Sequence, residues 1–211
     1  MSFSTFFFDL DETLYPASSG LWEAIRGRIN LYLRERMGFS QEEIDARRES
    51  YFREYGTTLR GLQANYPVDM EDYLAFVHAI SLDQYIHPDP ALRSMLAGLP
   101  GRKYIFTNAD RAHAERVMKV LGVQDQFDGI LDVHVIAPFC KPMPEAFGLA
   151  LKAAGGPVPH ECVLIDDQAR ITRAARQLGF YAVLMGKDGS SPDADAVIAS
   201  LLDLPSALEH S

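Results

Sequence analysis

Short runs of consecutive apolar residues, separated by segments with helical patterning, recur through the second half of the chain. These runs lie at 103–108, 129–135, 162–167 and 181–186, and a further run, Phe3–Phe8, stands near the beginning. The helical patterns lie near 110–121, 144–154 and 168–178, and they are followed by Gly122, Gly155 and Gly179. Strands that alternate with helices are typical of βαβ units. The pattern therefore predicts an α/β fold, with a Rossmann-like parallel sheet and helices on both of its faces.

The stretch from about residue 20 to 86 differs from the rest, because it is strand-poor and helical. Ser40 and Glu43 form a capping-box pattern, and Asp69 marks a further helix start. Asp89, which stands between two prolines, is expected to cap the helix that re-enters the sheet region. We therefore predict a discontinuous α/β core domain, residues 1–15 and 88–211, interrupted by a small inserted helical cap, residues 16–87.

Two carboxylates, Asp9 and Asp11, follow the first apolar run directly. Their i, i+2 spacing points both acids off the same side of an extended backbone. Open α/β sheets bind ligands at the carboxyl ends of their strands. Two like charges held this close need a cation, a shared proton or abundant solvent, and a divalent metal is the simplest solution. Taken alone, however, such a pair more often marks a solvated loop whose acids cap a turn.

Three later apolar runs also end in groups that suit a phosphate or metal site: Thr107-Asn108, Lys141-Pro142 and Asp166-Asp167. Each has an ordinary structural alternative. Asn108 or Asp110 can serve as the N-cap of the next helix, and an isolated lysine is normally a solvated surface charge. The occurrence of all of these motifs in one consistent order favours a functional site.

This series of motifs, Asp9-x-Asp11-x-Thr13 followed by the three later pairs, resembles the haloacid dehalogenase superfamily of phosphohydrolases. The resemblance implies a Mg²⁺-dependent phosphatase that acts on small phosphate monoesters. In such an enzyme Asp9 is the nucleophile that becomes an aspartyl-phosphate, and Asp11 is the general acid and base. The implied phosphate ligands are Thr107, Asn108 and Lys141, and the implied metal ligands are Asp9, Asp11 through its backbone carbonyl, Asp166 and Asp167. Where relatives carry an Asn or Asp after the paired acids, this chain has Ile171, which places more weight on Asp167.

Within the superfamily, the segment 51–62 together with 11–15 resembles the pyrimidine 5′-nucleotidase group. This resemblance implies a nucleoside 5′-monophosphate substrate, recognised by cap residues Tyr55, Thr58 and Arg60. The alternative is that Tyr51, Phe52 and Tyr55 are core aromatics of a helix and that Arg60 is a solvated surface residue. Other functions considered are a sugar-phosphate phosphatase or phosphomutase on the same fold, a haloacid dehalogenase and a non-catalytic binding protein.

Composition narrows the choice of partners. A formal net charge of −9 argues against a nucleic-acid polymer, since proteins that bind one carry basic patches. No apolar stretch approaches the length of a membrane span, so we expect a cytoplasmic protein. Cys140 and Cys162 show neither metal-ligand spacing nor a disulfide framework and are expected to be reduced. The histidines His78, His87, His113, His134 and His160 show no ligand spacing and are expected at the surface or in packing positions.

Overall fold

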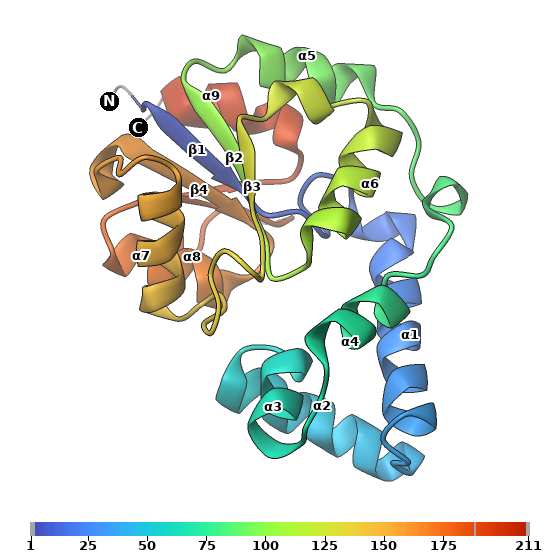
Figure 1. Ribbon diagram of the computed structural model, residues 1–211. Helices are drawn as coiled ribbons and strands as arrows, with labels where there is room; N and C mark the ends of the chain where they lie inside the picture. The colour runs from blue at the N-terminus through green and yellow to red at the C-terminus, as the bar shows by residue number, and fades with distance from the viewer. Residues whose placement is uncertain (1–2, 188, 210–211) are drawn as a thin grey trace. The chain divides into compact units, whose positions relative to one another are not determined.

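The computed structural model describes residues 3–187 and 189–209 (Figure 1). The chain divides into two compact units. One combines the chain up to Ser18 with the chain from Ile86 onward, and the other is Ser19–Tyr85. Within the described residues, no helix has both the length and the apolar character needed to cross a membrane.

The first unit is built on a parallel sheet, which confirms the predicted fold class. Within the described ranges it has six strands in the order β3-β2-β1-β4-β5-β6. The strands are β1 (Thr5–Phe8), β2 (Arg102–Phe106), β3 (Gly129–Leu131), β4 (Cys162–Asp166), β5 (Tyr181–Met185) and β6 (Ala196–Ile198). Phe8, the last residue of β1, pairs with Ile105 of β2 and Ile165 of β4. The polar residues that follow these three strands therefore arrive at the same edge of the sheet, where the strand order reverses direction.

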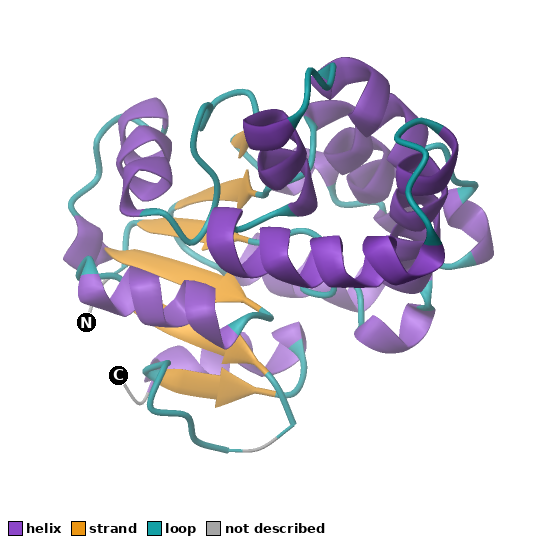
Figure 2. Ribbon diagram, turned by 90° about the horizontal axis from the view of Figure 1, so that it is seen from below, coloured by secondary structure: helices purple, strands orange, loops and turns teal. Residues whose placement is uncertain are grey.

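Helices cover both faces of this sheet (Figures 1 and 2). They are α5 (Pro90–Gly98), α6 (Arg111–Leu121), α7 (Pro144–Ala153), α8 (Ala169–Gln177) and α9 (Leu204–Glu209). Because neighbouring residues of a strand face opposite sides, Phe7 points toward α7 and α8. Phe6 and Phe8 point to the other face, where the ring of Phe8 meets that of Phe127 at a centroid distance of 5.7 Å. Both faces of β1 are thus buried by aromatic packing.

Local sequence signals set the ends of these helices. Asp89 caps α5 by accepting a hydrogen bond from the backbone N–H of Leu92. Asp110, rather than Asn108, caps α6. Both cysteines are buried and free, as the sequence predicts.

The second unit consists of helices: α1 (Leu21–Glu35), α2 (Gln41–Tyr55), α3 (Thr58–Asn65) and α4 (Met70–Val77). Ser40 and Glu43 form the predicted capping box at the start of α2, and Asp69 caps α4. Tyr32 of α1 packs edge-on against Tyr73 and Phe76. The unit therefore has an apolar core of its own.

Short 3-10 helices occur in both units, at Ala17–Ser19, Leu82–Gln84, Gln124–Gln126, Pro159–Glu161 and Leu201–Asp203. The edge strand β6 is an addition to the predicted set. It consists of only three apolar residues, Ala196–Ile198, a run too short to stand out in the sequence.

The close packing of α2 on α3 depends on Gly61. A Cβ atom at this position would lie 2.2 Å from Cγ of Tyr51. We expect Gly61→Ala to lower the free energy of unfolding by about 2–3 kcal/mol, the cost of an overpacked core. The matched control is Gly27→Ala in α1, where a Cβ would meet nothing within 4 Å. That variant should gain about 0.5–1 kcal/mol through helix propensity. Denaturant unfolding of both variants tests this, and equal effects would contradict the packing argument.

Candidate active site

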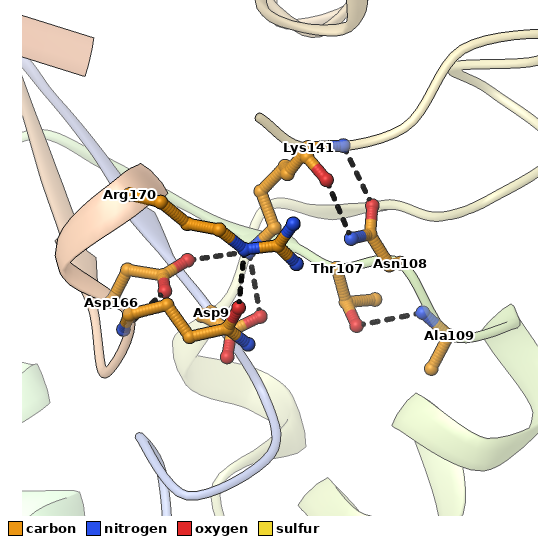
Figure 3. Close-up of polar contacts among 8 residues, drawn as sticks. Asp9, Thr107, Asn108, Ala109, Lys141, Asp166 and Arg170 are labelled. Atoms are coloured by element: carbon orange, nitrogen blue, oxygen red, sulfur yellow. Dashed lines mark hydrogen bonds and ion pairs between the residues drawn. The ribbon is translucent and has the colours of Figure 1, made fainter. Parts of the chain in front are cut away.

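Several of the site residues predicted from the sequence converge at the carboxyl ends of the strands (Figure 3). Asp9 follows β1 directly, Thr107 follows β2, and Asp166 is the last residue of β4. Lys141 comes from the loop between β3 and α7. The parallel register accounts for the first three positions, whereas the position of Lys141 depends on how its loop folds back over the sheet.

Lys141 lies at the centre of the cluster. Its side chain is 1% exposed, and Nζ donates to Oδ1 of Asp9 and to Oδ2 of Asp166, both at 2.7 Å. Burial by itself would lower the pKa of Lys141, but the two carboxylates outweigh it and raise this pKa above its usual value. Lys141 is therefore a fixed ammonium group. Burial raises the pKa of Asp9; Lys141 opposes this, and the neighbouring acids Asp166 and Asp167 add to it.

A third carboxylate gives the cluster an excess of negative charge. One oxygen each of Asp9, Asp166 and Asp167 can be chosen so that all three lie within 4.8 Å of one another. Burial, followed by the charge of Asp166, raises the pKa of Asp167 to about 7. Oδ1 of Asp167 is buried and accepts no hydrogen bond from the described part of the chain. Three acids around one lysine, with a buried oxygen still to be satisfied, fit a divalent cation with oxygen ligands.

Ile171 takes no part in this cluster. Its side chain is buried in the apolar core between the sheet and the helices α7 and α8. This position, where the family resemblance implies a polar residue, is thus used for packing, and among the described residues the acids grouped closely enough to hold a metal are Asp9, Asp166 and Asp167.

Asn108 connects two of the loops that carry the cluster, whereas Thr107 bonds within its own loop. The side-chain amide of Asn108 donates to the backbone oxygen of Lys141 at 3.1 Å, and its oxygen accepts from the backbone N–H of Lys141 at 2.8 Å. Thr107 is buried, and its hydroxyl oxygen accepts from the N–H of Ala109 at 3.0 Å. The side chain of Asn108 therefore holds the Lys141 loop in place. Phosphate binding by these two residues stays a prediction.

Asp11 lies in a separate polar group beside the cluster. Its Oδ1 atom accepts from the hydroxyl of Tyr15 at 2.6 Å and lies 3.0 Å from Nε2 of His113. His113 is 1% exposed, so the expectation that it is a mere packing or surface residue is incomplete, because it also contacts a predicted catalytic acid. In sequence, the available signal is its position three residues after the helix cap Asp110, in the first turn of α6.

Arg170 is a further charged residue that motif reasoning did not select. Its Nε donates to the side-chain oxygen of Gln168 at 3.0 Å, and Figure 3 draws it together with Asp9, Lys141 and Asp166. Burial lowers the pKa of Arg170, while neighbouring groups that include Asp166 and Asp167 act in the opposite direction. Arg170 thus places a positive charge in the first turn of α8, shortly after the paired acids Asp166 and Asp167.

The predicted substrate-recognition residues lie in the helical unit, around the turn between α2 and α3. Tyr55 packs edge-on against Tyr51, and Arg60 donates from Nη1 to Gln63 at 2.8 Å. Thr58 is the first residue of α3 and is half-buried. The alternative that aromatics in this segment are core residues holds for Tyr51, which is buried, and fails for Phe52, which is 46% exposed. Substrate contacts by Tyr55, Thr58 and Arg60 stay a prediction.

The charge balance of the cluster predicts a specific response to replacement of Lys141. We expect Lys141→Met to destabilise the metal-free protein by about 3–5 kcal/mol, because buried carboxylates lose their cation. Excess Mg²⁺ should restore a large part of this loss, as measured by thermal unfolding.

The matched control for Lys141→Met is Lys103→Met. Lys103 is also buried, but its Nζ donates to the backbone oxygens of Leu99 and Gly101, at 3.1 and 3.2 Å. Its loss should not respond to Mg²⁺ beyond the response of the wild type. Equal rescue of the two variants would show that Mg²⁺ does not act at the acidic cluster.

Asp167→Asn tests how much the charge of the third acid destabilises the folded protein. A folded-state pKa raised to about 7, above the unfolded value, means that ionisation of Asp167 opposes folding as the pH rises through that range. In the presence of chelator, the variant should melt about 2–4 °C above the wild type near pH ~8.5. The difference should shrink near pH ~5, where Asp167 is largely protonated in the folded wild type. A constant difference at both pH values would contradict this explanation.

Known proteins resemble this chain in sequence and in fold. The family model of haloacid dehalogenase-like hydrolases matches residues 3–179. Phosphate metabolism protein 8 of Saccharomyces cerevisiae is 30% identical to this chain, and the alignment covers 95% of this chain and 71% of the yeast protein.

Among solved structures, CbbY of Rhodobacter sphaeroides matches with a TM-score of 0.71 at 20% identity, covering 98% of this chain and 99% of CbbY. YfnB of Bacillus subtilis matches with a TM-score of 0.60 at 16% identity, covering 99% of both chains. The L-2-haloacid dehalogenase of Xanthobacter autotrophicus matches with a TM-score of 0.58 at 18% identity, covering 98% of both chains. These structural likenesses concern the fold, and the family model covers most of the sequence. The chain belongs to the haloacid dehalogenase-like hydrolases.

Proposed function

We propose that this hydrolase is a Mg²⁺-dependent phosphatase that acts on small phosphate monoesters through an aspartyl-phosphate intermediate. The observation that carries the proposal is the contact of the Lys141 ammonium with both Asp9 and Asp166, beside the further acid Asp167. Phosphoryl transfer depends mainly on positioning and on neutralising charge at the phosphoryl oxygens. A buried cation beside a carboxylate, at the carboxyl edge of the sheet, provides both.

In the proposed first step, a carboxylate oxygen of Asp9 attacks phosphorus in line with the ester oxygen. The bond between phosphorus and the ester oxygen breaks, and Asp11 gives its proton to the departing oxygen. In the second step Asp11, now a carboxylate, takes a proton from the attacking water, and Asp9 is released as inorganic phosphate leaves. Asp11 therefore ends the cycle protonated, as it began.

The remaining residues of the site have binding roles in this proposal. When bound by Asp9, Asp166, Asp167 and the backbone carbonyl of Asp11, Mg²⁺ supplies positive charge that offsets the repulsion between these acids and an anionic substrate. Lys141, held as an ammonium group, binds a phosphoryl oxygen as a compact point charge. The Thr107 hydroxyl and the backbone at Asn108 are proposed to donate hydrogen bonds to the other phosphoryl oxygens.

Several relatives support this proposal through what they bind. CbbY of Rhodobacter sphaeroides has been solved in complex with phosphate, and a mutant form of it in complex with xylulose-1,5-bisphosphate. YfnB of Bacillus subtilis has been solved bound to magnesium. The yeast relative is named for phosphate metabolism. These ligands belong to those proteins, and they agree with the charge of the acidic cluster in this chain.

For the substrate we propose a nucleoside 5′-monophosphate, with a pyrimidine base as the first choice. The support is the resemblance of the α2–α3 segment to the pyrimidine 5′-nucleotidase group, with Tyr55, Thr58 and Arg60 as the recognition residues and the helical unit as the cap. The sugar bisphosphate bound by the CbbY mutant favours a second candidate, a sugar-phosphate phosphatase.

The test is a panel of phosphate esters with Mg²⁺ or with chelator. It includes UMP, CMP, AMP, sugar phosphates and p-nitrophenyl phosphate. We expect Mg²⁺-dependent release of phosphate that Asp9→Asn lowers by at least about 10⁴-fold, because the nucleophile is lost. Asp125→Asn, at an exposed aspartate paired with Arg93, is the control and should retain activity.

The outcomes separate the mechanism from the substrate. Turnover that survives the chelator or Asp9→Asn would rule out the proposed mechanism. Equal turnover of all esters would leave the phosphatase in place and remove the nucleotide preference, and a clear preference for sugar phosphates would establish the second candidate.

A further inference from the structure

Two side chains from different parts of the chain contact one oxygen of the Asp11 carboxylate. Oδ1 lies 2.6 Å from the hydroxyl of Tyr15, four residues along, and 3.0 Å from Nε2 of His113, 102 residues away. Tyr15 and His113 are both buried, whereas Asp11 is partly accessible. The arrangement is thus a polar group within the core unit, in which two buried side chains contact a partly accessible acid.

Backbone structure places both donors. The chain turns sharply after β1, where Glu12 has a φ of 59° and the N–H of Leu14 bonds to the oxygen of Leu10 at 3.0 Å. This turn returns Tyr15 toward Asp11. His113 stands in the first turn of α6, where its backbone N–H bonds to the cap residue Asp110 at 2.9 Å. Both side chains are therefore directed by hydrogen-bonded turns of the backbone.

The chemistry of the donors fixes which oxygen can exchange a proton. The hydroxyl of Tyr15 is buried and lies 2.6 Å from Oδ1, to which it donates its proton. A carboxylate oxygen has about two acceptor sites. With Tyr15 and His113 both on Oδ1, the acceptor sites of this oxygen are filled. The other oxygen, Oδ2, is then the atom that gives and takes the catalytic proton.

We propose that His113 and Tyr15 are positioning residues that fix the rotation of the Asp11 carboxylate, so that its Oδ2 atom faces the ester oxygen and later the attacking water. This inference rests on the proposed function of Asp11 as general acid and base. His113 donates its Nε2 proton to Oδ1 and does not touch the substrate. It acts by holding the acid in the orientation for proton transfer.

The leaving group distinguishes positioning of an acid from general structural support. An alkyl phosphate needs its strongly basic leaving oxygen protonated, whereas p-nitrophenolate leaves without a proton. With His113→Leu, kcat for the alkyl ester that the wild type hydrolyses fastest should fall about 10²-fold, with KM within about threefold. The first-turnover burst of p-nitrophenolate should stay within about threefold of the wild-type rate, because Asp9 still attacks phosphorus.

Three variants accompany His113→Leu in these measurements. His113→Gln, whose amide can donate from a similar reach, should recover at least about tenfold of the lost kcat. Tyr15→Phe removes only the hydroxyl and should show the same dependence on leaving group with a loss of about tenfold. His160→Gln, at an exposed histidine outside the site, should equal the wild type.

A spectroscopic measurement tests the contact without activity. In NMR spectra of the uniformly labelled protein, one histidine should carry a slowly exchanging Nε2 proton that disappears in His113→Gln. Its chemical shift should change in Asp11→Asn and Tyr15→Phe, and it should not change in His160→Gln.

Five outcomes decide between these possibilities. Loss of kcat that depends on the leaving group, with rescue by glutamine, supports the inference. Equal losses on both esters, His113→Gln no better than His113→Leu, or an Nε2 proton indifferent to Asp11→Asn overturn it, even if the wild type is an active phosphatase. A wild type that releases no phosphate in the presence of Mg²⁺ removes the proposed function, and the inference with it.

Discussion

The contact of one buried ammonium group with two buried carboxylates organises this molecule. Nζ of Lys141 reaches Asp9 and Asp166 across sequence separations of 132 and 25 residues. None of these charges would be stable in the interior alone, because removal from water costs an ion several kcal/mol. Each therefore requires the others, and the cluster forms only when three separate segments meet. Even then the acids outnumber the lysine, so part of the desolvation cost remains until a ligand that binds only the folded state offsets it.

The sheet makes this concentration of charge possible. Its central strand, β1, is only four residues long, yet Phe6, Phe7 and Phe8 are almost completely inaccessible to solvent. Aromatic packing on both faces holds β1 between β2 and β4. Because the three strands are parallel and in register, the polar residues at their ends lie at the carboxyl edge of the sheet. Burial of the apolar layers on both faces of the sheet stabilises the fold, and this offsets the unfavourable electrostatics of the acidic cluster at the strand ends.

Sequence patterns predicted those parts of the structure that are determined locally. Apolar runs identified the central strands, and residues such as Asp69 and Asp110 marked helix starts, since each signal lies within a few neighbouring residues. The acids at the strand ends could be anticipated because parallel strands share an edge. His113 could not be linked to Asp11 in this way, since their contact depends on how the turn after β1 and the first turn of α6 meet in three dimensions. The hydrogen bonds between the Asn108 side chain and the Lys141 backbone could not be predicted for the same reason.

The paired hydrogen bonds between the Asn108 amide and the Lys141 peptide have a consequence for how such a protein can change over evolution. They attach the lysine to the segment that follows β2, so its position is set by the sheet and not by the length of the connection from β3 to α7. Insertions or deletions in that connection can then be absorbed without displacing the charge. The position of the ammonium group and the length of this loop are in this sense independent, so the surrounding surface can diversify while the ammonium group stays in place.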